Sequence, residues 1–356
     1  MNNEKKETLV KILKYYLISR IFLVIMMLIL NHFLKIKFPD IKNVLYLFDN
    51  EHFLDMAKNG IRFEYQYSFM PLTSIVIRYL GMPLTLILNQ ILAILSAYLI
   101  YLIGDKYLNI DNPIYPAILW LVSPIALFTL MFYSEAMFMF FTLFAYYLYR
   151  KKKYYFILGI TMGLAVATRS LGSMLFFSIF ICMMIRVFKK KENIKNVFIT
   201  YIPATIISCI YPIYLYFRTK RLFAFVDVEY TYWGRIHTNI FRILYDATYG
   251  LIHDMHPIYL LNYIITFFLI GYVIYLIIKG RKNKKQYDIY LYMIFTILIM
   301  CSSIRANGDA VTSFYRYIFG CFPIYFMLPR NRYVAMCLCY FTAFISTFFL
   351  LNMYFY

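Results

Sequence analysis

A short segment near the N-terminus concentrates side chains that can do acid–base chemistry. Asp49, Glu51 and His52 fall within four residues of one another. A carboxylate can take the proton of an attacking hydroxyl group, and carboxylate and imidazole groups can hydrogen-bond the hydroxyls of a sugar. The spacing of Phe48, His52 and Met56 equally fits an amphipathic helix lying on a surface. The segment alone leaves both interpretations open.

Two further ionisable residues are isolated inside long apolar segments. Glu135 is the lone charge between Pro113 and Tyr149, and Arg169 is the lone charge between residues 154 and 185. Ionisable residues within membrane-spanning segments are candidates for function. The alternative is a structural ion pair between Glu135 and Arg169.

Two later segments carry mixed charged and aromatic side chains. The first contains Asp227, Glu229, Tyr230, Tyr232, Trp233, Arg235 and His237, and the second contains Arg305, Asp309 and Arg316. The aromatic residues fit either a substrate site or an interfacial belt. An arginine of the second segment can hold a phosphate group or pair with Asp309. His253 and His256 lack a third clustered ligand, and the six cysteines lack zinc-ligand spacing, so we expect no metal site.

The composition requires a membrane environment. Hydrophobic residues make up 63% of the 356 residues and charged residues only 15%. The apolar residues form long blocks, and about 20 consecutive apolar residues suffice for one spanning helix. The formal net charge of +19 comes from short basic clusters between these blocks, which fits membrane topology better than binding to nucleic acid. We therefore expect an all-α polytopic membrane protein.

The basic clusters predict the topology. The five strongest clusters are assigned to the cytoplasm by the positive-inside rule, and they are Lys5–Lys14, Arg150–Lys153, Arg186–Lys195, Lys279–Lys285 and Arg330–Arg332. This assignment predicts about 11 transmembrane helices in a single domain, 1–356, with two large non-cytoplasmic loops at about 35–71 and 218–256. One basic cluster departs from the rule, because this topology places it on the non-cytoplasmic side: Arg218, Lys220 and Arg221. All the acid–base candidates fall on the non-cytoplasmic side.

Several stretches resemble the PIG-V family, the GPI mannosyltransferase 2 proteins. The first luminal loop of that family is similar to Phe48-Asp49-Asn50-Glu51-His52-Phe53-Leu54, followed by Ala57, Gly60, Glu64 and Phe69-Met70-Pro71. The resemblance continues at Ser123-Pro124, Tyr133 to Phe138, Ala167 to Gly172, Tyr232-Trp233, Arg316, Pro323 and Tyr325. Phe48, Met70 and Leu171 stand where the family has tryptophan, phenylalanine and asparagine.

The resemblance implies a GT-C type glycosyltransferase that needs no cofactor. Such an enzyme takes mannose from a dolichyl- or polyprenyl-phosphate donor and transfers it, with inversion, to a glycolipid acceptor resembling a GPI precursor. By the same resemblance, Asp49 is the catalytic base, and Glu51 and His52 orient the acceptor or the sugar. The implied substrate-binding residues are His52, Glu64, Glu135, Arg169, Tyr232, Trp233 and Arg316, with Arg169 or Arg316 meeting the donor phosphate.

Three alternatives to this function remain. The first is another lipid-phosphate-sugar transferase acting on a different glycolipid, wall polymer or protein. The second is a transporter or flippase, and the third is a non-catalytic subunit of a transferase complex. Membrane lipids and a small membrane subunit are expected partners. The expected location is the endoplasmic reticulum membrane for a eukaryotic chain and the plasma membrane for a prokaryotic one.

Overall fold

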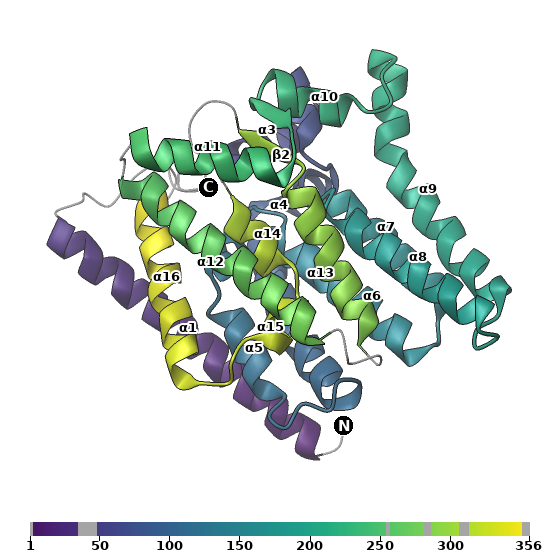
Figure 1. Ribbon diagram of the computed structural model, residues 1–356, viewed down its shortest axis with the longest axis horizontal. Coiled ribbons are helices and arrows are strands. Elements are labelled where there is room, and N and C mark those ends of the chain that lie inside the picture. Colours follow the sequence, from purple (N-terminus) through teal and green to yellow (C-terminus); the bar gives the residue numbers. More distant parts are fainter. Residues whose placement is uncertain (1–2, 35–47, 254–256, 281–285, 306–312, 351–356) are drawn as a thin grey trace.

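The computed structural model describes residues 3–34, 48–253, 257–280, 286–305 and 313–350, which form a helical assembly (Figure 1). The first half contains α1 (Asn3–Leu34), α3 (Asp49–Asn59), η1 (Glu64–Ser68), α4 (Leu72–Lys106), α5 (Ile114–Leu121), η2 (Pro124–Leu130), α6 (Glu135–Lys151) and α7 (Tyr155–Thr168). The second half contains α8 (Gly172–Phe188), α9 (Ile194–Thr219), α10 (Ala224–Thr231), β1 (Arg235–His237), α11 (Ile240–His253), α12 (Pro257–Gly280), α13 (Tyr287–Met300), β2 (Ser303–Arg305), α14 (Phe314–Gly320), α15 (Pro323–Met327) and α16 (Arg332–Leu350).

Some of these helices could cross a membrane. Among the described residues, α4 and α9 are long and apolar enough, and η2 with α6 passes the same test as one segment bent by 113°. Other helices are apolar but shorter. The 14-residue α7, for example, is about 21 Å long against ~30 Å for a bilayer core. The predicted helical, apolar character is therefore confirmed, whereas the count of about 11 spans is not confirmed and stays a prediction.

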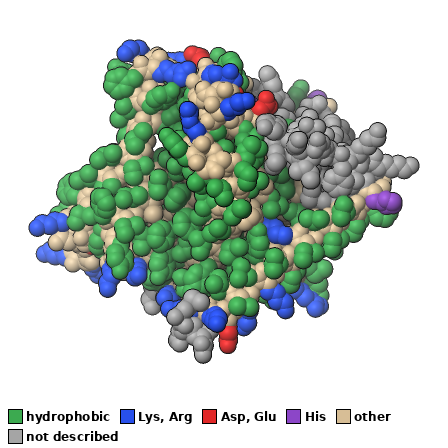
Figure 2. Space-filling view, turned by 180° about the vertical axis from the view of Figure 1, so that it is seen from behind, with side chains coloured by type: hydrophobic (Ala, Val, Ile, Leu, Met, Phe, Trp, Pro, Cys, Tyr) green, Lys and Arg blue, Asp and Glu red, His purple; other side chains and the backbone are tan. Residues whose placement is uncertain are grey.

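The outer surface is of the kind that a bilayer covers. Hydrophobic side chains occupy most of the face in Figure 2, and most Lys and Arg side chains lie along its edges. On α9, Ile206, Ile210 and Phe217 are each at least 60% exposed. Water-soluble proteins rarely leave so large an apolar area uncovered.

Two helical hairpins bring the isolated charges to one end of the molecule. Glu135 is the first residue of α6, after the sharp bend that follows η2. Arg169 lies in the turn between α7 and α8. This is the arrangement that the sequence predicted for both residues, because each stands near the middle of an apolar block that runs out and back.

Glycines allow α7 to pack closely on α9. A Cβ atom on Gly159 would lie 2.0 Å from the carbonyl oxygen of Thr200, and one on Gly163 would lie 2.6 Å from Cβ of Ile207. Small residues four apart let helix backbones approach in membranes, where polar and van der Waals contacts replace the hydrophobic effect. This contact holds the Arg169 turn in place.

A buried polar network fixes the end of η2 against α1 and α4. Arg20 of α1 donates to the carbonyl of Ala126 at 3.2 Å and to the hydroxyl of Thr129 at 3.0 Å. Gln90 donates to the carbonyl of Thr129 and accepts from Tyr16 at 2.8 Å. A cation is favourable beside the last carbonyls of a helix. The network thus positions the turn that leads to Glu135, and sequence patterning assigned Arg20 no such role.

The helix ends that carry the basic clusters meet at the end of the molecule opposite Glu135 and Arg169. Arg150 at the end of α6 lies 3.0 Å from Asp288 at the start of α13, and Arg330 lies 3.3 Å from Asp111. Of the predicted basic cluster Lys279–Lys285, residues 281–285 lie outside the described ranges. The molecule therefore has one end with basic helix termini and another built from α3, α10, α11 and the two strands (Figure 1).

Candidate functional site

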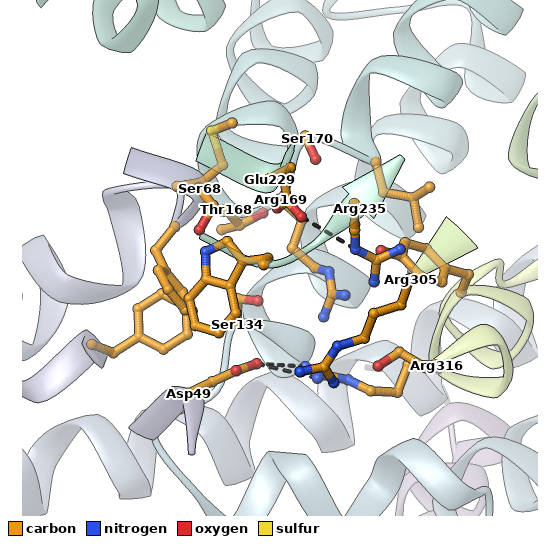
Figure 3. Close-up of a pocket in the computed structure, with 17 residues that line it drawn as sticks. Asp49, Ser68, Ser134, Thr168, Arg169, Ser170, Glu229, Arg235, Arg305 and Arg316 are labelled. Carbon is orange, nitrogen blue, oxygen red and sulfur yellow. Dashed lines mark hydrogen bonds and ion pairs between the residues drawn. The ribbon is translucent and has the colours of Figure 1, made fainter. Parts of the chain in front are cut away.

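A cavity of about 180 Å³ lies at the end that carries α3 and α10 (Figure 3). Segments far apart in the chain converge on it: the start of α3, the turns before α6 and α8, the segment after α10, and the segments around β2 and α14. Its charged lining consists of two carboxylates and four guanidinium groups, from Asp49, Glu229, Arg169, Arg235, Arg305 and Arg316. Ser68, Ser134, Thr168, Phe69 and Trp233 add hydroxyl groups and aromatic surface.

The start of α3 presents Asp49 to this cavity. Phe48, just before the helix, has φ of 55° and ψ of −129°, a conformation that non-glycine residues rarely adopt. Such strain persists where the surrounding structure imposes it, often at functional sites. Asn50 is fully buried, and its side-chain oxygen accepts from the backbone N–H of Phe132 at 2.9 Å. Asn50 thereby anchors the helix, while the Asp49 side chain remains 26% exposed.

Arg316 joins the carboxylates of Asp49 and Glu135. Its Nη1 and Nη2 each donate to Oδ2 of Asp49 at 3.1 Å, and its Nε and Nη2 donate to Oε1 of Glu135 at 3.0 and 2.6 Å. Arg169 donates to the same Glu135 oxygen. The Arg316 guanidinium also lies over the rings of Phe128 and Tyr133, at 4.7 and 5.0 Å from their centroids. Arg316 and Arg169 therefore both neutralise Glu135, which is only 2% exposed.

Two other arginines stand opposite each other on neighbouring strands. β1 and β2 pair antiparallel, with Arg235 in register with Arg305. Like charges directly opposite each other in a ladder are unfavourable. Nε of Arg235 lies 3.2 Å from Oε2 of Glu229, a contact drawn as a dashed line in Figure 3. This arrangement favours an anionic ligand between the strands and Asp49.

The carboxyl group of Glu229 has an altered acidity. Desolvation by burial raises its pKa above the usual 4.5, the nearby Asp49 charge adds to the increase, and Arg235 opposes it. A carboxylate with a raised pKa is a better proton acceptor. Sequence reasoning noted Glu229 within an outer loop but did not select it, because only the folded loop places it opposite Asp49.

An aromatic wall bounds the cavity on one side. His52 packs against the rings of Tyr65, Phe69 and Trp233, with centroids 5.4, 4.8 and 5.6 Å away. Nε1 of Trp233 donates to the carbonyl of Tyr65 at 3.2 Å, which ties the segment after α10 to η1. Desolvation lowers the pKa of His52 below 6.5, against the raising effect of Asp49, Glu51 and Asp55. The imidazole therefore packs behind the wall formed by Phe69 and Trp233, and its neutral form is favoured there.

The remaining predicted residues lie outside this cavity. Glu51 and His52 line a second cavity on the other face of α3. Glu64 and Tyr232 are about half exposed and contact each other, with the Tyr232 hydroxyl donating to Oε2 of Glu64 at 3.3 Å. The structure thus brings Asp49, Arg169, Trp233 and Arg316 together around one space, with Glu135 directly behind them.

The described residues contain no group of three or more His, Cys, Asp or Glu side chains arranged to hold a metal ion. Of the His253–His256 segment, residues 254–256 lie outside the described ranges, as does Asp309.

Comparisons of this chain with protein-family models, with curated proteins and with solved structures give no match. The chemistry of the site therefore rests on the residues and their geometry.

Proposed function

We propose that this protein is a membrane-embedded glycosyltransferase that uses a lipid-phosphate-linked sugar as donor and a glycolipid as acceptor. The multi-span topology and the non-cytoplasmic position of the site are parts of this proposal. The observation that carries it is the cavity in which Asp49 and Glu229 face four arginines beside an aromatic wall. Mannose from a dolichyl- or polyprenyl-phosphate donor is the sugar that the PIG-V resemblance favours, with transfer to an acceptor resembling a GPI precursor.

The proposed reaction uses the two kinds of charge differently. The acceptor hydroxyl oxygen bonds to the anomeric carbon while the bond from that carbon to the phosphate oxygen breaks. The electron pair of the broken bond stays on the lipid phosphate, and the hydroxyl proton passes to the carboxylate of Asp49. The phosphate thus changes from a singly charged diester to a monoester that carries more negative charge. Guanidinium groups placed beforehand stabilise charge that develops in this way.

The cavity contacts divide the arginines into two groups. Arg316 and Arg169 are engaged by Glu135 and Asp49, which favours a role in holding the base and the pocket wall. Arg235 and Arg305 lie in register on the strands, which favours them as contacts of the donor phosphate. This assignment departs from the expectation that Arg169 or Arg316 meets the phosphate. Those two groups pair with Glu135 and Asp49 in one network, whereas Arg235 pairs with the partly exposed Glu229 at the strands.

The test is sugar transfer by the purified protein in detergent. Dolichyl-phosphate-mannose and dolichyl-phosphate-glucose, each radiolabelled in the sugar, are offered with a lipid extract, and Asp49→Asn serves as the matched control. We expect label to move from the donor to a more polar lipid with the unchanged protein only. Transfer from the glucose donor alone would favour a different sugar, whereas no transfer from either donor by folded protein would contradict the proposal.

The transporter alternative is tested with the same labelled donors and with the protein reconstituted into vesicles. The kinked α4 and the bent η2–α6 pair are features that transporters also use. A flippase moves a lipid between leaflets without breaking the sugar–phosphate bond. If reconstituted vesicles translocate the intact donor and form no new labelled lipid, the flippase function replaces the enzyme proposal.

A further inference from the structure

The face of α3 opposite Asp49 lines a second, larger cavity of about 620 Å³. The rings of Phe63 and Tyr65 stack there, with centroids 5.3 Å apart and an angle of 8° between their planes. Oδ1 of Asp55 accepts from Asn59 and Arg62 at 2.6 Å each, and these contacts hold the carboxylate in place. Fixed carboxylates accept hydrogen bonds from hydroxyl groups, and flat aromatic surfaces pack on their C–H faces. This cavity suits a hydroxylated headgroup.

An apolar groove of about 310 Å³ lies on the other side of α4. It is formed between α4 and α9, the two described helices that are long and apolar enough to cross a membrane, and its lining includes Met56, Pro71, Ile75, Ile210 and Tyr211. Ile75 and Ile210 are 45% and 61% exposed, so the groove is open to the surroundings. Ser74 also lines it, is 4% exposed, and its hydroxyl has no hydrogen-bond partner in the described part of the chain. Such a groove suits a hydrocarbon chain with an ester group near one end.

Arg78 lines both cavities. Its side chain is exposed on α4, and within the described ranges it makes no hydrogen bond or ion pair. A charge on a spanning helix is costly without a counter-ion. Three residues further along, Gly81 breaks the helix with φ of 75° and ψ of 168°, and a Cβ atom there would meet nothing within 4 Å. Gly81 lines the same cavity as the Arg78 guanidinium.

We propose that the two cavities together bind one anionic phospholipid with a hydroxylated headgroup. Its hydrocarbon chain lies in the groove between α4 and α9, its phosphate contacts Arg78, and its headgroup enters the cavity beside Asp55 and the Phe63–Tyr65 stack. The occupant follows from the order of the three features, because a phospholipid carries tail, phosphate and headgroup in that sequence. The site goes beyond the proposed transfer reaction, since it lies on the other face of α3 and is tested without any sugar donor.

The experiment measures binding of fluorescent phosphatidylglycerol to the full chain in detergent, with phosphatidylserine and phosphatidylcholine as competitors. Phosphatidylserine has the same net charge without a free headgroup hydroxyl, and phosphatidylcholine has no net charge. We expect unlabelled phosphatidylglycerol to compete best and phosphatidylcholine worst. Equal competition by all three lipids would overturn the proposal and identify general detergent-like binding. Equal competition by the two anionic lipids would overturn the headgroup assignment.

Variants separate the parts of the site. Arg78→Gln should weaken binding about fivefold to tenfold, because it removes one basic contact with the phosphate. Ile75→Trp should block the groove. Arg332→Gln makes the same change of charge on an exposed arginine of α16, far along the chain, and should leave binding unchanged. Asp49→Asn should also leave it unchanged, even if it abolishes sugar transfer. Unaltered binding by both Arg78→Gln and Ile75→Trp, with thermal unfolding like that of the unchanged protein, would refute the site.

Discussion

Arg316 places two guanidinium nitrogens 3.1 Å from the same carboxylate oxygen of Asp49, although 267 positions separate the two residues. The same guanidinium also donates to Oε1 of Glu135, and Arg169 donates to that same oxygen. Four residues from four segments thus form one charged network. Its geometry orients Asp49 toward the cavity and leads to predictions on activity and on stability.

The first prediction concerns the base. Asp49→Asn keeps the shape of the side chain and removes its ability to accept a proton, so transfer should fall about 10²–10⁴-fold. Donor binding should remain, since the strand arginines are untouched. Glu229→Gln is the matched change across the cavity and should have the smaller effect on turnover. Single-turnover rates of the two folded variants decide the ranking. The opposite order would assign the base to Glu229.

The second prediction concerns the stability of the buried network. Arg316→Met leaves Glu135 and Asp49 without their shared cation, and breaking a buried pair in this way costs about 3–5 kcal/mol. Arg169→Gln should cost less, about 1.5–3 kcal/mol, because Glu135 keeps Arg316. Thermal unfolding in detergent should therefore give the order unchanged protein, Arg169→Gln, Arg316→Met. Equal unfolding temperatures for all three would show that the network does not stabilise the fold.

The third prediction uses the raised pKa of Glu229. In the folded protein the neutral carboxyl group is favoured relative to the unfolded chain. Stability should therefore decrease as the pH rises from 4.5 through the folded pKa. Glu229→Gln cannot ionise, so the difference in unfolding temperature between variant and unchanged protein should shift in favour of the variant across this window. A constant difference from pH 4 to 8 would contradict the shift.

The fourth prediction uses the lowered pKa of His52. The fold disfavours the imidazolium form among the rings of Tyr65, Phe69 and Trp233. Stability should therefore fall as the pH drops below 6.5, down to the folded pKa, and be fully present above 6.5. His52→Gln should remove this dependence, although it also loses ring packing at every pH. Unfolding temperatures measured from pH 5 to 8 test the slope, and Tyr65→Phe provides a control that retains the histidine.

The fifth prediction concerns topology. Single cysteines are placed at exposed Asn59, His237 and Lys152, and labelling of the unchanged protein is subtracted. An impermeant thiol reagent should label Asn59→Cys and His237→Cys from the non-cytoplasmic side, and Lys152→Cys from the cytoplasm. The structure places residues 59 and 237 at the end with α3 and the strands, and residue 152 at the end of α6. Labelling of Asn59→Cys and Lys152→Cys from the same side would contradict the predicted orientation.

Composition and patterning alone determined the apolar, helical character of this chain. Long apolar blocks favour helices when water is excluded, because a helix hydrogen-bonds its backbone groups within its own segment. The same patterning placed Glu135 and Arg169 near the turns of two hairpins, because a lone charge in the middle of an apolar block is least costly where the chain reverses. Residue type and local clustering marked Asp49, Glu51 and His52 as candidates, and the resemblance to the PIG-V family then selected Asp49 as the base. These inferences need no knowledge of distant contacts.

The tertiary structure alone decided which candidate residues share a space. Glu51 and His52 neighbour Asp49 in sequence, yet the helical turn of α3 directs them into a different cavity. Glu229 and the Arg235–Arg305 pair enter the site because a two-stranded ladder joins segments separated by about seventy residues. Arg78 acquires its place between two cavities only when α9 packs near α4. Local sequence sets helices and turns, whereas contacts between distant segments depend on the packing of the whole chain.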